Sequence, residues 1–190
     1  MKLAIIKEFI KSPTTVGTIM PSSSYLADAI TSSIGLENAD VVVEIGPGSG
    51  AFTGHILYKL KKGSKFLMIE LNRDFYDRLK KKYPDLKIIN DTAENLTQLL
   101  LSEGITRADV IISGLPWAVF SSSLQISILK QVHNCLVDGG RFATYAYFQG
   151  CFLPSGKRFR KTLKDYFSDV QRSDLVVKNF PLAYVYRCIK

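Results

Sequence analysis

The feature that most constrains the fold is the run from Val41 to Gly50, in which an apolar, β-branched segment leads directly into a glycine-rich turn. The segment Val-Val-Val-Glu-Ile is what a central parallel strand covered on both faces requires. The glycines at 46, 48 and 50 carry no side chains, so a ligand can lie directly on the main chain near the start of the next helix. The run therefore predicts a nucleotide-type cofactor site.

Two carboxylates help to choose between cofactors, because the glycine spacing, with Ala51, also fits the dinucleotide fingerprint. Glu44 lies just ahead of the turn, where a carboxylate would repel a pyrophosphate but could hold the ammonium group of an amino-acid-bearing cofactor. Glu70 follows the expected strand 65–69, where an acid can accept hydrogen bonds from both ribose hydroxyls. Glu70 serves either cofactor, and Glu44 favours S-adenosylmethionine (SAM).

Further polar residues follow the next two expected strands. Asp91 and Thr92 come after the third strand, and the loop from Ser113 to Trp117, Ser-Gly-Leu-Pro-Trp, follows the fourth. An acid near the end of each of the first three strands, then a proline-containing loop, resembles the motif series of class I SAM-dependent methyltransferases over nearly the whole chain. The resemblance implies that the glycines wrap the methionine part of SAM, Glu70 holds the ribose, Asp91 and Thr92 read the adenine, and the 113–117 loop faces the transferred methyl group.

The alternation of expected strands and helices predicts right-handed crossovers and a parallel sheet. The last two strands are separated by only residues 179–182, too few for a helical crossover, so they should form an antiparallel pair. We expect an α/β, Rossmann-like, doubly wound sheet of seven strands in a single domain, 1–190, whose first 35 residues form a lid or membrane-contacting segment. Strands are expected near 41–45, 65–69, 86–90, 109–113, 139–147, 169–178 and 183–189, with helices near 2–11, 22–34 and 155–166 and in the gaps between the first five strands.

Composition indicates a globular domain that is drawn to polyanions. The chain has 190 residues, 46% of them hydrophobic, and 25 Lys+Arg against 17 Asp+Glu, a net charge of +8. Such a balance favours nucleic acid or an anionic membrane surface. No apolar stretch suits a bilayer span, and the three cysteines fit neither a disulfide framework nor a metal site. We expect a cytoplasmic protein, peripheral at the inner face of the membrane if it acts on lipid, with no bound metal; composition predicts no oligomeric state.

The sequence leaves two classes of methyl acceptor as alternatives, an RNA base and a phospholipid amine. The 113–117 loop and the segment around the glycine turn resemble the rRNA adenine dimethyltransferases, in which an Asn or Asp opens the loop and an aromatic residue stacks on a flipped base. Here Ser113 opens it. The segments 16–27 and 179–187 resemble the bacterial-type phosphatidylethanolamine N-methyltransferases, in which the part matching Met20 to Ser23 closes over the cofactor. The residues expected to contact SAM are Met20, Ser22, Ser23, Glu44, Gly46, Gly48, Gly50, Glu70, Leu71, Asp91, Thr92 and Ser113.

The predicted helix 2–11 carries an apolar face flanked by lysines, which suits either a headgroup plane or docking on the domain itself. A basic cluster, defined as Lys157, Arg158, Arg160, Lys161 and Lys164, follows the fifth strand and should overlook the active site. Together the two segments predict reversible attachment to anionic membranes.

Methyl transfer to a primary amine requires that the amine first lose a proton. Neither histidine is well placed, so we expect deprotonation by desolvation, by a tyrosine such as Tyr25 or Tyr145, or through water. Trp117, Tyr145 and Tyr147 could also accommodate a developing ammonium by cation–π contact. The candidate catalytic residues are Ser113, Trp117, Tyr25 and Tyr145.

The sequence thus predicts a SAM-dependent N-methyltransferase acting on a phospholipid headgroup such as phosphatidylethanolamine. An adenine N6-dimethyltransferase of RNA is the alternative, and a SAM-binding module without enzymatic activity is a third possibility.

Overall fold

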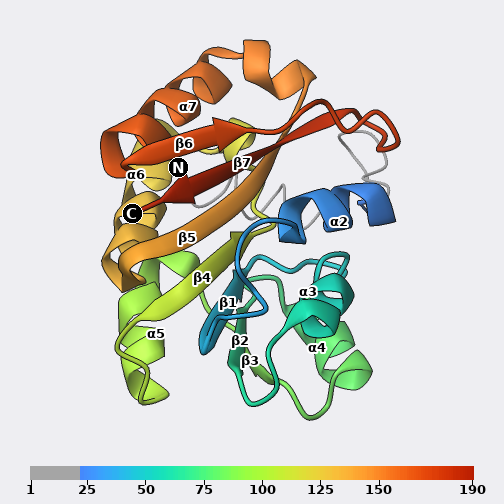
Figure 1. The fold of residues 1–190 in the computed structure, drawn as a ribbon, viewed down its shortest axis with the longest axis vertical. Helices are drawn as coiled ribbons and strands as arrows, with labels where there is room; N and C mark the ends of the chain where they lie inside the picture. Colours follow the sequence, from blue (N-terminus) through green and yellow to red (C-terminus); the bar gives the residue numbers. More distant parts are fainter. Residues whose placement is uncertain (1–21) are drawn as a thin grey trace.

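A seven-stranded sheet runs through the part of the chain that the computed structural model describes, residues 22–190 (Figure 1). Its order is β3-β2-β1-β4-β5-β7-β6, with β1 to β5 parallel and β7 antiparallel to both of its neighbours. The expected doubly wound sheet with an antiparallel C-terminal pair is confirmed. The strands are β1 (Val41–Ile45), β2 (Lys65–Ile69), β3 (Lys87–Ile89), β4 (Ala108–Ser113), β5 (Leu136–Tyr147), β6 (Asp169–Arg172) and β7 (Ala183–Ile189).

Helices cover both faces of this sheet, α2, α3 and α4 on one side and α5, α6 and α7 on the other (Figure 1). Several begin at a polar cap: Asn72 accepts from the Phe75 N–H at the start of α4, and Ser121 accepts from the Leu124 N–H at the start of α6. Within residues 22–190 no helix combines the length and apolar character needed to cross a membrane. The helices are α2 (Ser24–Thr31), α3 (Thr53–Lys59), α4 (Arg73–Lys82), α5 (Leu96–Ser102), α6 (Ser122–Cys135) and α7 (Pro154–Tyr166), with short 3-10 turns η1 (Ala93–Asn95), η2 (Trp117–Val119) and η3 (Gln149–Phe152).

Three boundaries differ from the sequence-based expectation. Helix α2 ends at Thr31 rather than near 34, because the hydroxyls of Thr31 and Ser32 donate back to carbonyls of their own helix and Ser33 takes a positive φ of 58°. Strand β5 begins at Leu136, earlier than expected, and β6 ends at Arg172, well short of 178. The expected helix 2–11 and Met20 lie outside the described residues.

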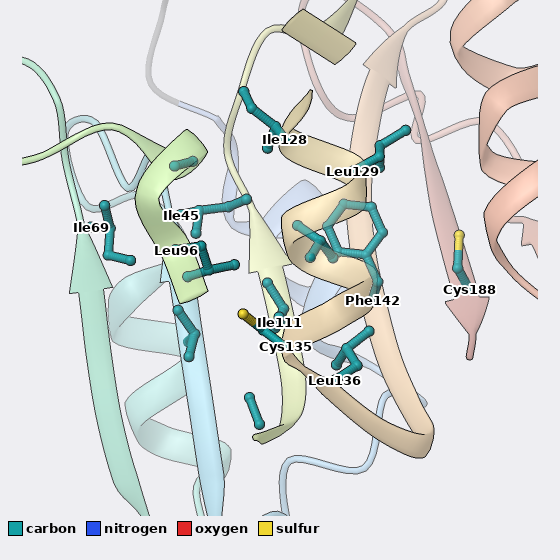
Figure 2. Packing of buried hydrophobic residues seen from close by; sticks show 14 of the residues in the cluster. Ile45, Ile69, Leu96, Ile111, Ile128, Leu129, Cys135, Leu136, Phe142 and Cys188 are labelled. Atoms are coloured by element: carbon teal, nitrogen blue, oxygen red, sulfur yellow. The ribbon is translucent and has the colours of Figure 1, made fainter. Parts of the chain in front are cut away.

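The larger core lies between the sheet and α5, α6 and α7, and Figure 2 shows part of it. Ile128 and Leu129 of α6 pack over β4 and β5, against Ile111 and Phe142. Burying each such side chain contributes about 1.5–3 kcal/mol. The core therefore fixes the registers of the central strands, and with them the positions of the loops at their C-terminal ends.

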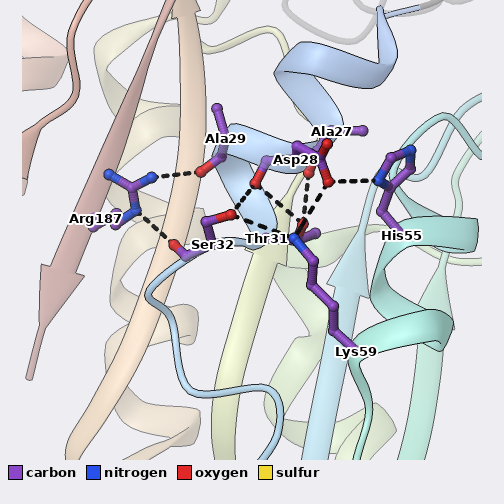
Figure 3. Close-up of polar contacts among 8 residues, drawn as sticks. All are labelled: Ala27, Asp28, Ala29, Thr31, Ser32, His55, Lys59 and Arg187. Atoms are coloured by element: carbon purple, nitrogen blue, oxygen red, sulfur yellow. Dashed lines mark hydrogen bonds and ion pairs between the residues drawn. The ribbon is translucent and has the colours of Figure 1, made fainter.

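Helix α2 is held at the edge of the opposite face by a polar network (Figure 3). From β7, Arg187 donates through Nε to the Ser32 carbonyl, at 2.9 Å, and through Nη2 to the Ala29 carbonyl. From α3, Lys59 Nζ donates to the Thr31 hydroxyl at 2.8 Å and approaches Asp28 at 3.4 Å. Arg187 thus satisfies the Ala29 carbonyl in the last turn of α2, which a helix leaves without an internal partner, and the carbonyl of the cap residue Ser32.

We expect Arg187→Ala to destabilise the fold by roughly 1–3 kcal/mol, because it leaves carbonyls at the end of α2 without a donor. Urea unfolding measures this change. The control is Arg73→Ala, which removes an exposed i,i+4 pair with Asp77 and should cost at most about 0.5 kcal/mol. Equal effects of the two substitutions would contradict a structural role for Arg187.

Candidate functional site

The loops that follow β1 and β4 touch at the C-terminal edge of the sheet. The Gly46 N–H donates to the Ile69 carbonyl at 2.8 Å, and the Gly114 N–H donates to the Ile45 carbonyl at 2.9 Å. A Cβ at Gly114 would lie 2.3 Å from the Gly46 carbonyl oxygen, so this approach tolerates no side chain. In open α/β sheets, ligands bind in the crevice at this edge.

The glycine turn after β1 takes a left-handed backbone conformation at all three glycines. Gly46, Gly48 and Gly50 take φ values of +65°, +56° and +77°, a region that residues with a Cβ rarely adopt. A Cβ at Gly48 would meet no atom within 4 Å, so the backbone of this turn borders open space. A ligand can therefore lie directly against it.

Glu70 joins this turn to the end of β2. Its Oε2 accepts from the Gly48 N–H at 2.9 Å and its Oε1 from the Asn72 N–H at 2.8 Å. Burial raises the pKa of the Glu70 carboxyl, and hydrogen bonds from the backbone of Asn72, Gly48 and Leu71 oppose the rise. Each carboxylate oxygen has a second lone pair, so Glu70 keeps acceptor capacity for a ligand. Leu71 beside it is 47% exposed.

Glu44 lies fully buried on β1, on the side of the sheet that α3 covers. Its Oε2 accepts from the Thr53 hydroxyl at 2.8 Å, while its Oε1 is buried with no partner among the described residues. Burial, opposed by this hydrogen bond and reinforced by the charge of Glu70, raises the pKa of the Glu44 carboxyl to about 8. A buried acceptor without a donor is costly, and a cationic ligand group would satisfy it.

Asp91 and Thr92 lie at the end of β3, beside the loop that carries Glu70 and Leu71. The Asp91 Oδ1 accepts from the Thr92 N–H at 2.6 Å and from Asn95 Nδ2 at 2.9 Å. Thr92 caps η1, with its hydroxyl accepting from the next turn. Both side chains are half-buried, and local hydrogen bonds fix their positions.

The loop after β4 is closed by its own side chains. The indole N–H of Trp117 donates to Thr144 Oγ1 at 2.8 Å and lies 3.2 Å from Ser113 Oγ, which also accepts from the Leu115 N–H. The Trp117 ring is 2% exposed and stacks on Phe159 with centroids 4.6 Å apart. Ser113 and Trp117, both expected to face the methyl acceptor, are thus buried and hydrogen-bonded to their surroundings, and their role toward the acceptor stays a prediction. The indole donates to the Thr144 hydroxyl on β5, a partner that lies beside the loop only in the folded sheet.

The two candidate tyrosine bases lie in different surroundings. Tyr145 packs edge-on against Phe52, just after the glycine turn, and against Tyr147, at 5.7 and 5.2 Å between centroids. Burial raises the pKa of the Tyr145 phenol well above its usual value, so the phenolate form that a base would require is scarce near neutral pH. Tyr25 is 51% exposed on α2, with Lys178 Nζ 4.7 Å from its ring centroid.

The two terminal segments that the sequence singled out meet in the fold. The Ser23 N–H donates to Asn179 Oδ1 at 2.9 Å, and Asn179 Nδ2 donates to the Pro181 carbonyl at 2.6 Å. Asn179 is buried, so the chain entering α2 through Ser22 and Ser23 is attached to the turn between β6 and β7. This attachment places Ser22 and Ser23 at the same edge of the sheet as the loops described above.

A family profile described as "Ribosomal RNA adenine dimethylase" matches residues 14–137, which contain the glycine turn and the loop after β4. The chain belongs to this family. Two relatives illustrate its range. An ornithine lipid N-methyltransferase from Singulisphaera acidiphila is 31% identical over 138 residues, 71% of this chain and 72% of the relative. A ribosomal RNA small subunit methyltransferase A from a Hydrogenobaculum species is 31% identical over 124 residues, 65% of this chain but only 46% of the relative.

Solved methyltransferases share the fold of this rRNA adenine dimethylase family member. An O-methyltransferase from Bacillus cereus in complex with SAH has a TM-score of 0.72 and 11% identity, covering 98% of this chain and 91% of that one. TomG from Streptomyces achromogenes, an O-methyltransferase in complex with SAM, has a TM-score of 0.72 and 14% identity, covering 98% and 89%. The protein is a class I SAM-dependent methyltransferase.

The site's residues fit SAM. The orphaned Glu44 Oε1 suits the ammonium group, Glu70 retains lone pairs for ribose hydroxyls, and the open Gly48 backbone leaves room between them. Sequence reasoning missed Thr53 and Thr144, whose hydroxyls hold Glu44 and Trp117. Neither lies in a recognisable motif. Residues 22–190 contain no group of three or more His, Cys, Asp or Glu side chains that could hold a metal ion.

The raised pKa of Glu44 should make stability depend on pH. Folding raises this pKa from 4.5 to about 8, so the folded chain holds the proton more tightly than the unfolded chain. The stabilisation is present in full below about pH 4.5 and is lost as pH rises through about 8. The free energy of unfolding, measured with urea, should fall across this pH window more for the wild type than for Glu44→Gln. Saturating SAM should reduce the difference. Parallel pH profiles for the two proteins would contradict the assignment.

The contact between the two loops should tolerate no methyl group. Gly114→Ala forces the loops after β1 and β4 apart, so we expect a loss of about 1–3 kcal/mol in stability and weaker SAM binding. The matched control is Gly54→Ala within α3, where the nearest atom to a new Cβ is 3.8 Å away and the change should stabilise by about 0.5–1 kcal/mol. Urea unfolding measures the stability of both variants, and calorimetry measures their affinity for SAM. Stability should fall in Gly114→Ala and rise in Gly54→Ala, and equal changes in the two variants would count against the loop contact.

Proposed function

We propose that this protein transfers a methyl group from SAM to the amine of a membrane-lipid headgroup such as phosphatidylethanolamine. The observation that carries the proposal is the length over which relatives match. The relative named as a lipid N-methyltransferase is matched over 72% of its length, whereas the first two rRNA methyltransferases are matched over 46% and 43% of theirs. The resemblance of segments 16–27 and 179–187 to lipid enzymes, and their contact through Ser23 and Asn179, supports the same choice.

The geometry of the loop after β4 also favours a small amine over a nucleobase. Reading a flipped base relies on hydrogen bonds to its edge and on stacking against an aromatic or apolar side chain. Here Ser113 replaces the amide or carboxylate and already accepts from Leu115, and the Trp117 ring is stacked on Phe159. RNA remains the second candidate because of the family profile and the net charge of +8.

We assign the cofactor contacts as follows. Glu44 holds the ammonium and the glycine turn the methionine part, while Glu70 holds the ribose hydroxyls. Leu71, Asp91 and Thr92 enclose the adenine. Ser22 and Ser23 close over the cofactor, as expected for the segment that also includes Met20, which is outside the described residues, and Ser113 contributes by fixing the loop after β4. When bound, SAM would supply an activated methyl group on a sulfonium centre, with S-adenosylhomocysteine as the leaving group.

The chain's own residues position the amine and exclude water. The raised pKa of Tyr145 argues against a phenolate base, so we assign deprotonation of the amine to desolvation at the site, with the proton passing to solvent. The rings of Tyr145 and Tyr147 lie at the end of β5 and can accommodate the cationic product by cation–π contact. We assign Tyr25 to contact with the headgroup rather than to a buried base, because its ring is exposed on α2 beside Lys178.

A product assay tests the proposal. Methyl-labelled SAM is incubated with phosphatidylethanolamine vesicles in one arm and with a structured rRNA fragment in the other. We expect label in the lipid extract and none in the RNA. Label in the RNA alone would establish the second candidate, and SAM binding without label in either arm would favour a non-enzymatic role.

The ribose assignment is tested by Glu70→Ala, which should weaken SAM binding by about 1–3 kcal/mol because it leaves buried donors unpaired. Calorimetry measures the affinity, and urea unfolding checks that the variant is folded. The control is Glu37→Ala, an exposed acid remote from the site. Unchanged affinity in folded Glu70→Ala would remove Glu70 from the cofactor site.

A further inference from the structure

A cavity of about 370 Å³ lies at the β6 and β7 side of the sheet, beneath η3 and the first turns of α7. Three cationic residues line it, Lys157 and Arg160 from α7 and Arg172 from the end of β6. Aromatic side chains form much of the rest, among them Phe148 and Tyr184. Among residues 22–190, no acidic side chain lines the cavity.

The positive charge of this cavity is not neutralised by the described part of the chain. None of Lys157, Arg160 and Arg172 forms an ion pair with a carboxylate within residues 22–190. Arg172 is held by its ring partner, with Cζ 4.2 Å from the Tyr184 centroid, and Lys157 and Arg160 are neighbours at i,i+3 on α7. Like charges gathered in one hollow repel one another, and an anion would relieve that repulsion.

Apolar side chains stand exposed beside these cations. Phe152, which lines the cavity, is 63% exposed, and Leu153 next to it is 49% exposed. Exposed aromatic and aliphatic groups beside lysine and arginine are typical of a surface that lies in a lipid headgroup layer. A soluble anion would need the cations but would gain nothing from Phe152 and Leu153.

The cavity is separate from the proposed methyl-transfer site. That site lies over β1 and β4, whereas the cavity lies over β7 and β6, two to three strands further along the sheet. At about 4.8 Å per strand the separation is roughly 10–14 Å, too far for the phosphate of a phosphatidylethanolamine molecule whose amine is being methylated. An anion bound in the cavity would therefore belong to a different molecule. Both sites nevertheless lie at the same edge of the sheet, because Tyr184 begins β7 and Arg172 ends β6.

We infer that the cavity binds the phosphate of an anionic phospholipid that is not the methyl acceptor, with Lys157, Arg160 and Arg172 on the phosphate and Phe152 and Leu153 in the acyl layer. This lipid anchors the sheet edge on the membrane and presents the methyl-transfer site to neighbouring headgroups. The inference rests on the proposed lipid substrate. It divides the basic cluster into residues that line a binding site and residues that contribute only charge.

The test compares two triple variants that remove the same charge. One is Lys157→Ala, Arg160→Ala, Arg172→Ala, which empties the cavity of cations. The other is Arg158→Ala, Lys161→Ala, Lys164→Ala, taken from the same helix but outside the cavity lining. Sedimentation with phosphatidylcholine vesicles, with and without phosphatidylglycerol, measures binding without SAM or acceptor lipid, so the result does not depend on which lipid is methylated.

The cavity variant should lose at least tenfold more affinity for phosphatidylglycerol vesicles than the control variant, while SAM affinity and thermal unfolding stay at wild-type values. A folded single variant, Arg160→Gln, should show the same direction of change if the triple variant does not fold. Equal losses of vesicle affinity in the two triple variants would mean that the basic cluster acts only through its total charge, and would overturn the inference. It would also fail if glycerol phosphate bound as tightly as vesicles, or if the cavity variant lost affinity for structured RNA and kept it for vesicles.

Discussion

The hydrogen bonds that Glu70 accepts from Gly48 and Asn72 are the constraint on which the site depends, because they join the ends of β1 and β2 through one buried carboxylate. Without them, the turn after β1 would lose its side-chain link to the end of β2 and would keep the backbone bond from the Gly46 N–H to the Ile69 carbonyl. The third loop is added by the Gly46–Gly114 approach, which only two glycines permit. Three loops from strands distant in sequence thus form one concave edge.

The main unfavourable free energy in this arrangement comes from burying the Glu44 carboxylate. Its carboxylate is buried among apolar side chains and half satisfied by Thr53, so the free protein favours the protonated form. A cationic ligand reverses that preference, because it supplies the missing donor and a compensating charge. Affinity for the ligand and pH-dependent stability therefore have one physical origin. The same carboxylate would be unfavourable beside a pyrophosphate, which explains why the dinucleotide interpretation of the glycine turn does not suit this chain.

Sequence reasoning succeeded where local pattern determines structure. The β-branched strand, the glycine turn and the alternation of elements each predict their own geometry. The final strand pair had to be antiparallel because even the connection that the structure shows between β6 and β7, residues 173–182, is too short for a helical crossover. It did not predict the partners of Trp117, because the direction of an indole depends on groups that folding brings together. Thr144 is 27 residues away on β5 and Phe159 is on α7, and no local signal connects either with the loop.

Turning Trp117 inward changes what the edge of the sheet can offer an acceptor. An exposed indole would supply a stacking surface for a base, whereas a buried one supports the loop after β4 and packs on α7 through Phe159. The loop is further tied to α7 because Ser155 donates to the Ala118 carbonyl. Helix α7, which carries Lys157 and Arg160, is therefore packed directly against the loop after β4. A lipid held by α7 and a headgroup presented to that loop would share one rigid frame, so anchoring at the membrane would itself orient the site toward its substrate.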